Sequence, residues 1–403
     1  TKIFRLLPKS LAADVFSYLP IELEQDIIVA LSDKEAGHIL DNLNADDAAD
    51  LIDEMPANVV KKLLANADPE TRRDINHLLQ YPDASAGSIM TVEFMDLKES
   101  YTVEQSLRKI RMEGIDKETI NTCYILNPHR RLLGAISLRR LLLSDPVEKM
   151  SNIMEDHVIS VSTQTDQEEV AQLFQKYDFT SIPVVDSEER LVGIITVDDI
   201  VDILQQEATE DIEKMAAITP TDKPYMKTGV LETWKKRIPW LLILMISATF
   251  TGRIISHYEA ALASYVVLTA FIPMLMDTGG NAGSQASVSI IRGLSLNEID
   301  YSDTIKILFK ELLVGILIGA TLAVANFVKL LIIDRVSVTI AIVVCLTLIV
   351  TVIFAKLVGC SLPVLAKRLG FDPAVMASPF ITTIVDALSL MMYFKIAGAI
   401  LHI

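Results

Sequence analysis

Cysteine is scarce in this sequence of 403 residues, which has three of them at widely separated positions, Cys123, Cys345 and Cys360. No two of them have the CxxC spacing, and no pair of histidines lies near them. The spacing excludes a disulfide framework and a zinc site. The six histidines are scattered, and the sequence has neither a nucleophile elbow nor a glycine-rich phosphate-binding loop, so an enzyme is the least favoured class of function.

Basic charge is also in short supply, and the deficit is confined to the first half. Residues 1–227 contain 42 acidic and 23 basic side chains, a net charge of −19, whereas residues 228–403 contain 10 and 13, a net charge of +3. Nucleic-acid binding needs an excess of Lys and Arg, so the acidic half argues against such a partner. The charge suits cation binding, although acidic charge also serves simply to keep a domain soluble.

The second half is apolar enough to be a membrane region. The whole sequence is 51% hydrophobic with a mean hydropathy of +0.39, more than an average soluble enzyme. A helix needs roughly 20 residues to cross the bilayer core. Five stretches meet this length, at residues 238–256, 262–291, 305–333, 336–358 and 375–401. We therefore assign residues 238–403 to a transmembrane domain of five α-helices.

Basic residues near the ends of these stretches predict a multi-pass protein of the cell membrane with cytoplasmic N-terminal domains and an extracellular C-terminus, because loops rich in Lys and Arg stay in the cytoplasm. The chain starts at Thr1 without an apolar leader, so we expect a few natural residues before Thr1 and targeting by the spans themselves. The basic groups are Lys235-Lys236-Arg237 before the first span, Arg292, Lys306 and Lys310 around the loop after the second, and Lys367-Arg368 in the loop after the fourth.

The first 68 residues contain a repeat of 12 residues. Each repeat opens with an apolar residue and a helix-starting residue, and an apolar pair follows one or two helical turns later. Short helices on a fixed period predict an α-helical solenoid, which we assign to residues 1–87. The openings are Leu7-Pro8, Leu19-Pro20, Leu31-Ser32, Leu43-Asn44, Met55-Pro56 and Ala67-Asp68.

A second duplication covers residues 88–150 and 151–204. Each copy is predicted to contain an amphipathic helix and two strands. The segments that begin at Ser181 (SIPVVD) and Leu191 (LVGIITVDD) resemble the cystathionine-β-synthase (CBS) domain, which implies a tandem α/β CBS pair. The predicted helices cover Val103 to Arg111 and Glu168 to Tyr177, and the strands cover Thr122 to Leu126, Leu132 to Ile136, Ser181 to Val185 and Leu191 to Ile195.

CBS pairs often bind adenine nucleotides through a Ser or Thr and a downstream Asp. Thr196 and Asp199 fit that pattern in the second copy, whereas Ser137 of the first copy is followed by Arg140. The resemblance therefore leaves ATP binding open.

A helix is predicted from Ile200 to about Thr219, and it runs out of the second copy into a connecting segment of residues 205–237. Acidic residues crowd along it and its approach, and such crowding is self-repulsive unless cations bind. A solvated acidic face is the alternative. The position between the CBS pair and the first span favours a functional role. The residues are Asp198, Asp199, Asp202, Glu207, Glu210, Asp211 and Glu213.

The second span carries a polar row. Asp277, Asn281 and Gln285 are four residues apart and lie on one helical face. Glycines at 279, 280 and 283 predict a thin or distorted stretch that permits close backbone approach or exposes carbonyls, which is tolerated at membrane depth only beside a polar cavity. The alternative is a polar seam between helices. In the third span, Gly315, Gly319 and Ala323 predict close helix packing instead.

The fifth span repeats the pattern with Ser378, Thr382 and Asp386, and Ser389 continues the face. A carboxylate at a helix centre costs about 2.5–3.5 kcal/mol, so Asp386 predicts an ion or proton pathway. Magnesium loses its waters reluctantly, and one ring of carboxylates with amide and hydroxyl groups suits the hydrated ion. A potassium channel would show a carbonyl filter, which the sequence lacks.

The order of these parts resembles the MgtE family of magnesium channels over essentially the whole chain. The resemblance implies a homodimer in the lipid bilayer with the pore on its two-fold axis, so that Asp386 occurs twice near Asn281. It also implies that cytosolic Mg²⁺ bound among the solenoid, the CBS pair and the connecting helix holds the pore shut. The contribution of the solenoid, around Asp46, Asp47 and Asp50, has no assigned ligands. The matching sensor carboxylates are Asp199, Asp202, Glu207, Glu210 and Asp211, with Asp166, Glu168 and Asp178 as weaker matches.

The sequence is thus interpreted as a magnesium-selective channel that mediates Mg²⁺ influx and closes when cytosolic Mg²⁺ binds. The alternative is a coupled carrier or exchanger of Mg²⁺ or another divalent cation that uses the same Asp386. The two differ in whether the flux saturates and follows a second ion gradient.

Overall fold

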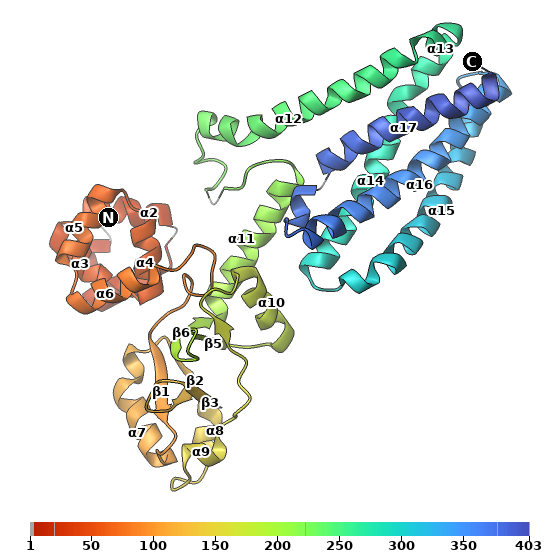
Figure 1. Ribbon diagram of the computed structural model, residues 1–403. Helices are drawn as coiled ribbons and strands as arrows, with labels where there is room; N and C mark the ends of the chain where they lie inside the picture. Colours follow the sequence, from red (N-terminus) through yellow and green to blue (C-terminus); the bar gives the residue numbers. More distant parts are fainter. Residues whose placement is uncertain (1–3, 20, 222, 377, 403) are drawn as a thin grey trace. The chain divides into compact units, whose positions relative to one another are not determined.

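The computed structural model describes residues 4–19, 21–221, 223–376 and 378–402. It divides into two compact units, Thr1–Gln205 and Gln206–Ile403 (Figure 1). The first unit holds short helices and two small sheets, and the second holds long helices. Short 3-10 segments also occur at Phe4–Leu6, Gly114–Asp116, Val266–Phe271, Tyr301–Asp303 and Pro373–Met376.

The predicted solenoid is confirmed. Ser32 caps its helix by accepting a hydrogen bond from the Glu35 backbone N–H, and the Glu35 carboxylate in turn accepts a bond from the Ser32 backbone N–H. Pro8, Asn44, Pro56 and Asp68 precede other helices of the repeat, and the opening at Pro20 lies outside the described residues. The helices are α1 (Lys9–Ser17), α2 (Ile21–Ala30), α3 (Asp33–Leu40), α4 (Ala45–Asp53), α5 (Ala57–Asn66) and α6 (Pro69–Leu78).

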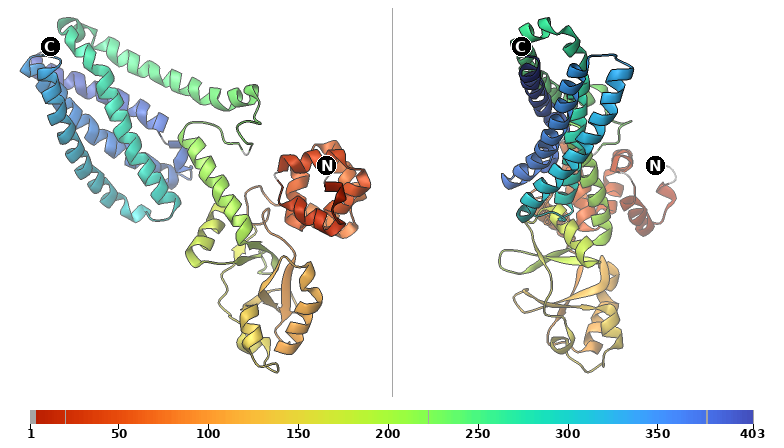
Figure 2. Two further views of the ribbon diagram at one scale, coloured as in Figure 1. Left: turned by 180° about the vertical axis from the view of Figure 1, so that it is seen from behind. Right: turned by 90° about the vertical axis from the view of Figure 1, so that its right-hand side faces the viewer.

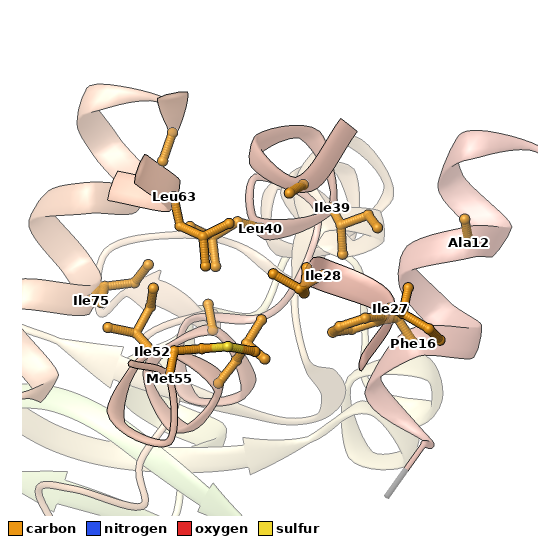
Figure 3. Close-up of a cluster of buried hydrophobic side chains, with 14 of the residues drawn as sticks. Ala12, Phe16, Ile27, Ile28, Ile39, Leu40, Ile52, Met55, Leu63 and Ile75 are labelled. Carbon is orange, nitrogen blue, oxygen red and sulfur yellow. The ribbon is translucent and has the colours of Figure 1, made fainter. Parts of the chain in front are cut away.

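One hydrophobic core joins these helices, and the 12-residue period explains it. Figure 3 shows that side chains from successive helices line this core, among them Phe16, Leu40 and Ile75, which are each 0% exposed. The leucines that open the first four repeats are partly buried against the same cluster. A core residue recurs at each repeat because no short helix can bury its apolar face alone.

The CBS pair consists of two sheets with the same topology. In each sheet the first and second strands pair in parallel and the second and third pair antiparallel. Tyr124 of the first copy bonds Ser181 of the second, with 2.8 Å between the two hydroxyl oxygens. The strands are β1 (Phe94–Lys98), β2 (Thr119–Leu126), β3 (Leu132–Ser137), β4 (Val161–Ser162), β5 (Ser181–Val185) and β6 (Leu191–Thr196), and the helices are α7 (Val103–Glu113), α8 (Leu138–Leu143), α9 (Met150–Ile153) and α10 (Gln167–Tyr177).

The connecting helix α11 (Val197–Met215) starts and ends earlier than predicted. It follows β6 directly, so that Asp198 and Asp199 lie in its first turn, where negative charge is favourable at a helix N-terminus. Residues 216–219, predicted to be helical, lie beyond its end, and the Thr219 N–H bonds the Lys236 carbonyl at 3.1 Å.

Six further helices make up most of the second unit (Figure 2). Within the described residues, four helical segments are long and apolar enough to cross a membrane: Val230–His257, Thr304–Ile332, Val338–Arg368 and Pro373–Leu401. The predicted second span is not among them. The helices are α12 (Val230–His257), α13 (Glu259–Ser264), α14 (Ile272–Ser295), α15 (Thr304–Ile332), α16 (Val338–Arg368) and α17 (Ser378–Leu401).

The second span differs from its prediction for a chemical reason. Asp277, Asn281, Gln285 and three glycines lower the hydropathy of α14, and residues 262–271 form other short elements before it. Helices α14, α16 and α17 nevertheless pack closely against one another. A multi-helix membrane region is therefore supported, and the count of five spans stays a prediction.

Two further boundaries in this unit differ from the sequence prediction. Helix α12 begins at Val230, before the basic group, and contains Pro239 within it. Helix α16 continues to Arg368, so Lys367-Arg368 form its last turn and do not lie in a loop, as predicted. Basic side chains are favourable at a helix C-terminus, which accounts for the extension.

Candidate ion-binding sites

The polar row of α14 lies on the exposed face of that helix. Asp277, Asn281 and Gln285 are all exposed in the single chain, whereas Gly279, Gly280 and Gly283 are buried. The glycines face α16 and α17: a Cβ at Gly280 would lie 2.9 Å from Thr382 Cγ2. Helix α14 is continuous, so the glycines permit close packing and do not break the helix. Of the two outcomes predicted for this stretch, close approach to the neighbouring helices is the one that the structure shows, and distortion of the helix is not seen.

Asp386 of α17 lies beside this row and is half-buried. Its Oδ1 atom is buried and has no hydrogen-bond partner within the described parts of the chain. Asp277 is near enough for the two carboxylate charges to repel each other. Thr382, one turn earlier, packs its methyl group toward Gly280. The structure thus brings together Asp277, Thr382 and Asp386 at the seam between α14 and α17.

Of the last two residues predicted for this face, Ser389 does not join the group. Ser389 is 2% exposed, faces Gly279, and donates a hydrogen bond of 2.6 Å to the Val385 carbonyl. It is a packing residue of the seam. The side chain of Ser378 lies outside the described residues.

A cluster of carboxylates joins α4 to the start of α11 within the first unit. Asp46 is 9% exposed, and its Oδ1 atom has no hydrogen-bond partner among the residues described. Burial and the charge of Asp199 raise the pKa of Asp46 well above its ordinary value, and the same two causes raise the pKa of Asp47 to about 7. Burial also raises the pKa of Asp199, although Thr196 Oγ1 donates a bond of 2.6 Å to Asp199 Oδ2.

Glutamates of neighbouring elements extend this cluster. Burial raises the pKa of Glu118 to about 7, and the charges of Asp199 and Asp198 add to this effect. Glu118 accepts a hydrogen bond from the Asn44 side-chain amide, which joins the solenoid to the first CBS copy. Burial also raises the pKa of Glu24 on α2 to about 8, with Asp47 and Asp50 as neighbours. The site thus accumulates negative charge that a divalent cation would relieve.

These residues define what we call the upper acidic cluster: Glu24, Asp46, Asp47, Asp50, Glu118, Asp198, Asp199 and Asp202. Within the described chain, no group of three or more Asp, Glu, His or Cys side chains is close enough to hold a bare metal ion. Direct ligation would therefore need a movement of these side chains, and a hydrated ion would need less movement because its waters extend its reach.

The other end of α11 carries a second group, the lower acidic cluster, formed by Glu210, Asp211 and Asp372. Lys214 Nζ lies 2.5 Å from Glu210 Oε1 and 2.6 Å from Asp372 Oδ2. Burial and the charge of Asp372 raise the pKa of Asp211, whose Oδ2 accepts a 3.4 Å bond from Ser295. Sequence reasoning missed Asp372, which lies in a short loop far along the chain with no local pattern to mark it.

The carboxylates predicted along α11 therefore separate into two groups. Asp199 and Asp202 belong to the upper cluster, and Glu210 and Asp211 belong to the lower one. Glu207 lies between them and is half-buried. Eleven residues, three helical turns, separate Asp199 from Glu210, so one ion cannot contact both.

The weaker matches on α10 have local roles. Asp166 caps the helix by accepting a 2.8 Å bond from the Glu168 backbone N–H, and Glu168 lies in the first turn. Asp178 ends the helix in the left-handed conformation, with a φ of 54°. Asp166 and Glu168 lie at the start of α10 and Asp178 lies just after its end, so the structure does not bring all three together.

A buried ion pair in the second unit was also missed. Glu311 of α15 and Lys356 of α16 approach to 3.9 Å between Oε2 and Nζ, and their side chains are 14% and 6% exposed. The sequence signal was present, since both residues interrupt predicted apolar spans. Their proximity to the predicted span ends concealed it.

Comparisons with known proteins agree with this architecture. Family models match the MgtE intracellular N domain at residues 1–84, the CBS domain at 150–206, and the MgtE divalent cation transporter domain at 272–396. The magnesium transporter MgtE of Thermus thermophilus is 39% identical over 410 residues, which cover 99% of this chain and 89% of that protein. The magnesium transporter MgtE of Bacillus subtilis is 35% identical, over 99% of this chain and 91% of that protein.

The first half of the chain is also similar to a solved structure. The crystal structure of the soluble part of a magnesium transporter is 33% identical, covers 51% of this chain and 81% of that chain, and has a TM-score of 0.50. With relatives this similar over nearly its whole length, the chain belongs to the MgtE family of magnesium transporters and is a membrane transport protein, not an enzyme.

Proposed function

We propose that this chain is a magnesium channel that mediates Mg²⁺ influx as a homodimer and closes when cytosolic Mg²⁺ binds its acidic clusters. One observation carries the pore assignment: Asp277, Asn281 and Gln285 form an exposed row on α14, and Asp386 lies beside it. In a membrane, an exposed polar row has to face water or another chain, since contact with lipid leaves its polar groups unsatisfied.

A two-fold axis along this row would satisfy both conditions. Two copies of Asp386 would then face one pathway, together with the amides of Asn281 and Gln285. Hydrated Mg²⁺ binds through its own waters to carboxylate and amide oxygens, and such a pathway needs few charges. The packed glycines on the opposite side of α14 keep this face fixed against α16 and α17.

The proposed closure by Mg²⁺ rests on the negative charge of α11 and of the elements next to it. Without divalent ions, the carboxylates within each cluster repel one another, and burial, followed by the neighbouring negative charges, raises their pKa values. Mg²⁺ binding would lower the energy of the arrangement in which they are close together. That differential affinity shifts the population toward one state, which we assign as closed.

Asp372 suggests how the signal reaches the pore. It lies at the start of the segment that leads into α17, which carries Asp386, and its Oδ1 accepts a 2.8 Å bond from the Ala374 N–H. Met215, the last residue of α11, packs with Ile291 and Ala374. A change at the lower cluster therefore acts directly on the elements that carry the polar row and Asp386.

The remaining predictions enter here as proposals. The protein lies in the cell membrane with its N-terminal half in the cytoplasm. That half consists of the solenoid (residues 1–87), the two CBS copies (88–150 and 151–204) and the connecting segment (205–237), and the pore domain follows at residues 238–403. Thr196 and Asp199 are the candidate ATP contacts. Asp199 is already bonded to Thr196 and belongs to the upper cluster, so ATP and Mg²⁺ would act on the same carboxylate.

Single-channel recording of the full-length protein in planar bilayers tests the proposal. We expect discrete Mg²⁺ currents whose open probability falls as Mg²⁺ is raised on the side of the N-terminal half. Flux without discrete openings, dependent on a proton or sodium gradient, would instead establish the coupled carrier. Mg²⁺ currents insensitive to Mg²⁺ on that side would contradict the proposed gate.

A further inference from the structure

A cavity of about 460 Å³ lies at the start of α12, outside both acidic clusters and the polar row. Its walls come from the turn that precedes α12 and from the first turns of that helix. Trp234, Arg237, Ile238 and Leu241 line it and follow the spacing of one helical face. Tyr225 and Met226 close the other side.

Arg237 is the basic side chain that lines this cavity. The other cations nearby are engaged elsewhere: Lys223 pairs with Glu232 at 3.1 Å, and Lys236 Nζ donates a 2.8 Å bond to the Pro220 carbonyl. Among the residues that the structure describes, the side chain of Arg237 forms no ion pair or hydrogen bond. A guanidinium in a mostly apolar recess is a site for an anion, and its planar donors fit a phosphate group with two bonds.

The apolar part of the site is as informative as the charge. The exposed fractions of Met226 and Tyr225 are 91% and 73%, and that of Trp234 is 56%. Such exposure is costly in water and is typical of the membrane interface, where Trp and Tyr concentrate. Helix α12 is one of the helices that can cross a membrane, so the cavity lies at its interfacial end.

We propose that this cavity binds an anionic phospholipid of the leaflet at the N-terminal end of α12. Arg237 holds the phosphate, Trp234 and Tyr225 flank the glycerol, and the acyl chains follow Ile238 and Leu241 along the helix. A soluble phosphate would use Arg237 and leave the apolar lining unused, so the lining favours the amphiphile. The ligand ties the linker between α11 and the membrane helices to the bilayer surface.

Tryptophan fluorescence of the full-length protein provides the test, because the sequence contains two tryptophans, Trp234 and Trp240. The Trp240→Phe variant leaves Trp234 as the reporter. This variant is placed in phosphatidylcholine vesicles that contain an increasing fraction of either brominated phosphatidylglycerol or brominated phosphatidylcholine, with the bromine on the acyl chains in both cases. We expect phosphatidylglycerol to quench Trp234 at about fivefold lower concentration, the equivalent of about 1 kcal/mol.

Two variants distinguish binding of the lipid in the cavity from its attraction by the general surface charge. Arg237→Gln should remove the preference for phosphatidylglycerol, and Lys235→Gln, which removes the same charge two residues away and outside the cavity, should keep it. Retention of the size-exclusion profile shows that each variant is folded. Equal quenching by both lipids, equal loss in both variants, or displacement of the lipid by millimolar inorganic phosphate would overturn the proposal.

Discussion

Glu311 and Lys356 form an ion pair inside the bundle of long helices, with 3.9 Å between Oε2 and Nζ. Both side chains are nearly buried, and Glu311 Oε2 has no hydrogen-bond partner in the described part of the chain. The pair joins α15 to α16, which also meet through Gly315 and Gly319, where an added Cβ would lie 3.1–3.2 Å from the α16 backbone. A buried pair of this kind is fragile, because removal of one partner leaves the other charge unpaired.

Replacing Glu311 with Gln should therefore destabilise the protein by about 3–5 kcal/mol, since it leaves the Lys356 ammonium buried without a counter-charge. The double variant Glu311→Leu with Lys356→Met should recover most of this loss. Thermal unfolding in detergent measures both. A double variant as unstable as the single one would mean that the charges are not coupled.

Asp386→Asn should abolish or sharply reduce Mg²⁺ flux into vesicles while leaving folding and oligomeric state unchanged, because it removes the carboxylate beside the polar row. Ser389→Ala is the matched control on the same helix. Ser389 is buried against Gly279, so this change should leave the flux nearly intact. Normal flux in Asp386→Asn would place the ion pathway elsewhere.

The two acidic clusters should contribute separately to closure. Asp199→Asn with Asp202→Asn removes charge from the upper cluster, and Glu210→Gln with Asp211→Asn removes it from the lower cluster. Each pair should keep conduction and raise the cytosolic Mg²⁺ needed for closure, with the largest shift when all four are combined. Patch recordings over a range of cytosolic Mg²⁺ measure the shift. Wild-type closure in the fourfold variant would refute the sensor.

The sequence predicted the helices and strands correctly wherever the spacing of apolar residues along a segment reflects which side chains are buried. The opening leucines of the solenoid recur every 12 residues because each one packs on the shared core, and the strands β5 and β6 appear as apolar runs of the right length. The strands β1 and β4 were missed. β4 has only two residues, and β1, Phe94–Lys98, contains Asp96, so neither carries a clear apolar period.

The sites were predictable in part, for a related reason. Asp386 and the α14 row were identified because a polar side chain in an apolar helix is conspicuous in a single segment. Glu118 and Asp372 become part of the acidic clusters only through tertiary contacts with α11 and its neighbours. No local pattern encodes such contacts, and the division of the α11 carboxylates into two groups depends on them.

The upper acidic cluster should make the first unit less stable as pH rises in the absence of Mg²⁺. The folded pKa values of Asp47 and Glu118, both about 7, exceed the ordinary values near 4, so the folded state binds more protons than the unfolded state between about pH 4 and pH 7. Stability therefore falls as pH rises through that window and levels off above it. Hydrogen exchange of α4 amides in the full chain, at several pH values, measures the fall.

Saturating Mg²⁺ should reduce this pH dependence, because a bound divalent ion replaces the protons that the carboxylates would otherwise hold. Sodium at matched ionic strength serves as the control. A stability that rises with pH in the Mg²⁺-free protein would show that these carboxylates are not repelling one another.

The final prediction concerns protection of the first half from proteolysis. Residues 1–227 carry a net charge of −19 within compact domains, and unscreened like charges at about 4 Å cost on the order of 1 kcal/mol per pair even in water. Divalent ions bound between carboxylates cancel this repulsion locally, whereas monovalent salt only screens it. Limited proteolysis of the full-length protein should therefore show that Mg²⁺ protects the α4 and α11 segments and that sodium at equal ionic strength does not.

The variant Asp46→Asn with Asp47→Asn provides the internal comparison, because it removes buried charge from the upper cluster without touching α11. It should resist proteolysis without Mg²⁺ better than the natural chain does, and it should gain less from adding the ion, since less repulsion remains to be cancelled. Exposed Asp83→Asn, on the loop after α6, changes the net charge without altering the cluster and should behave as the natural chain. Equal protection of the natural chain by both salts would reduce the acidic surface to a solubility feature and leave the pore without its sensor.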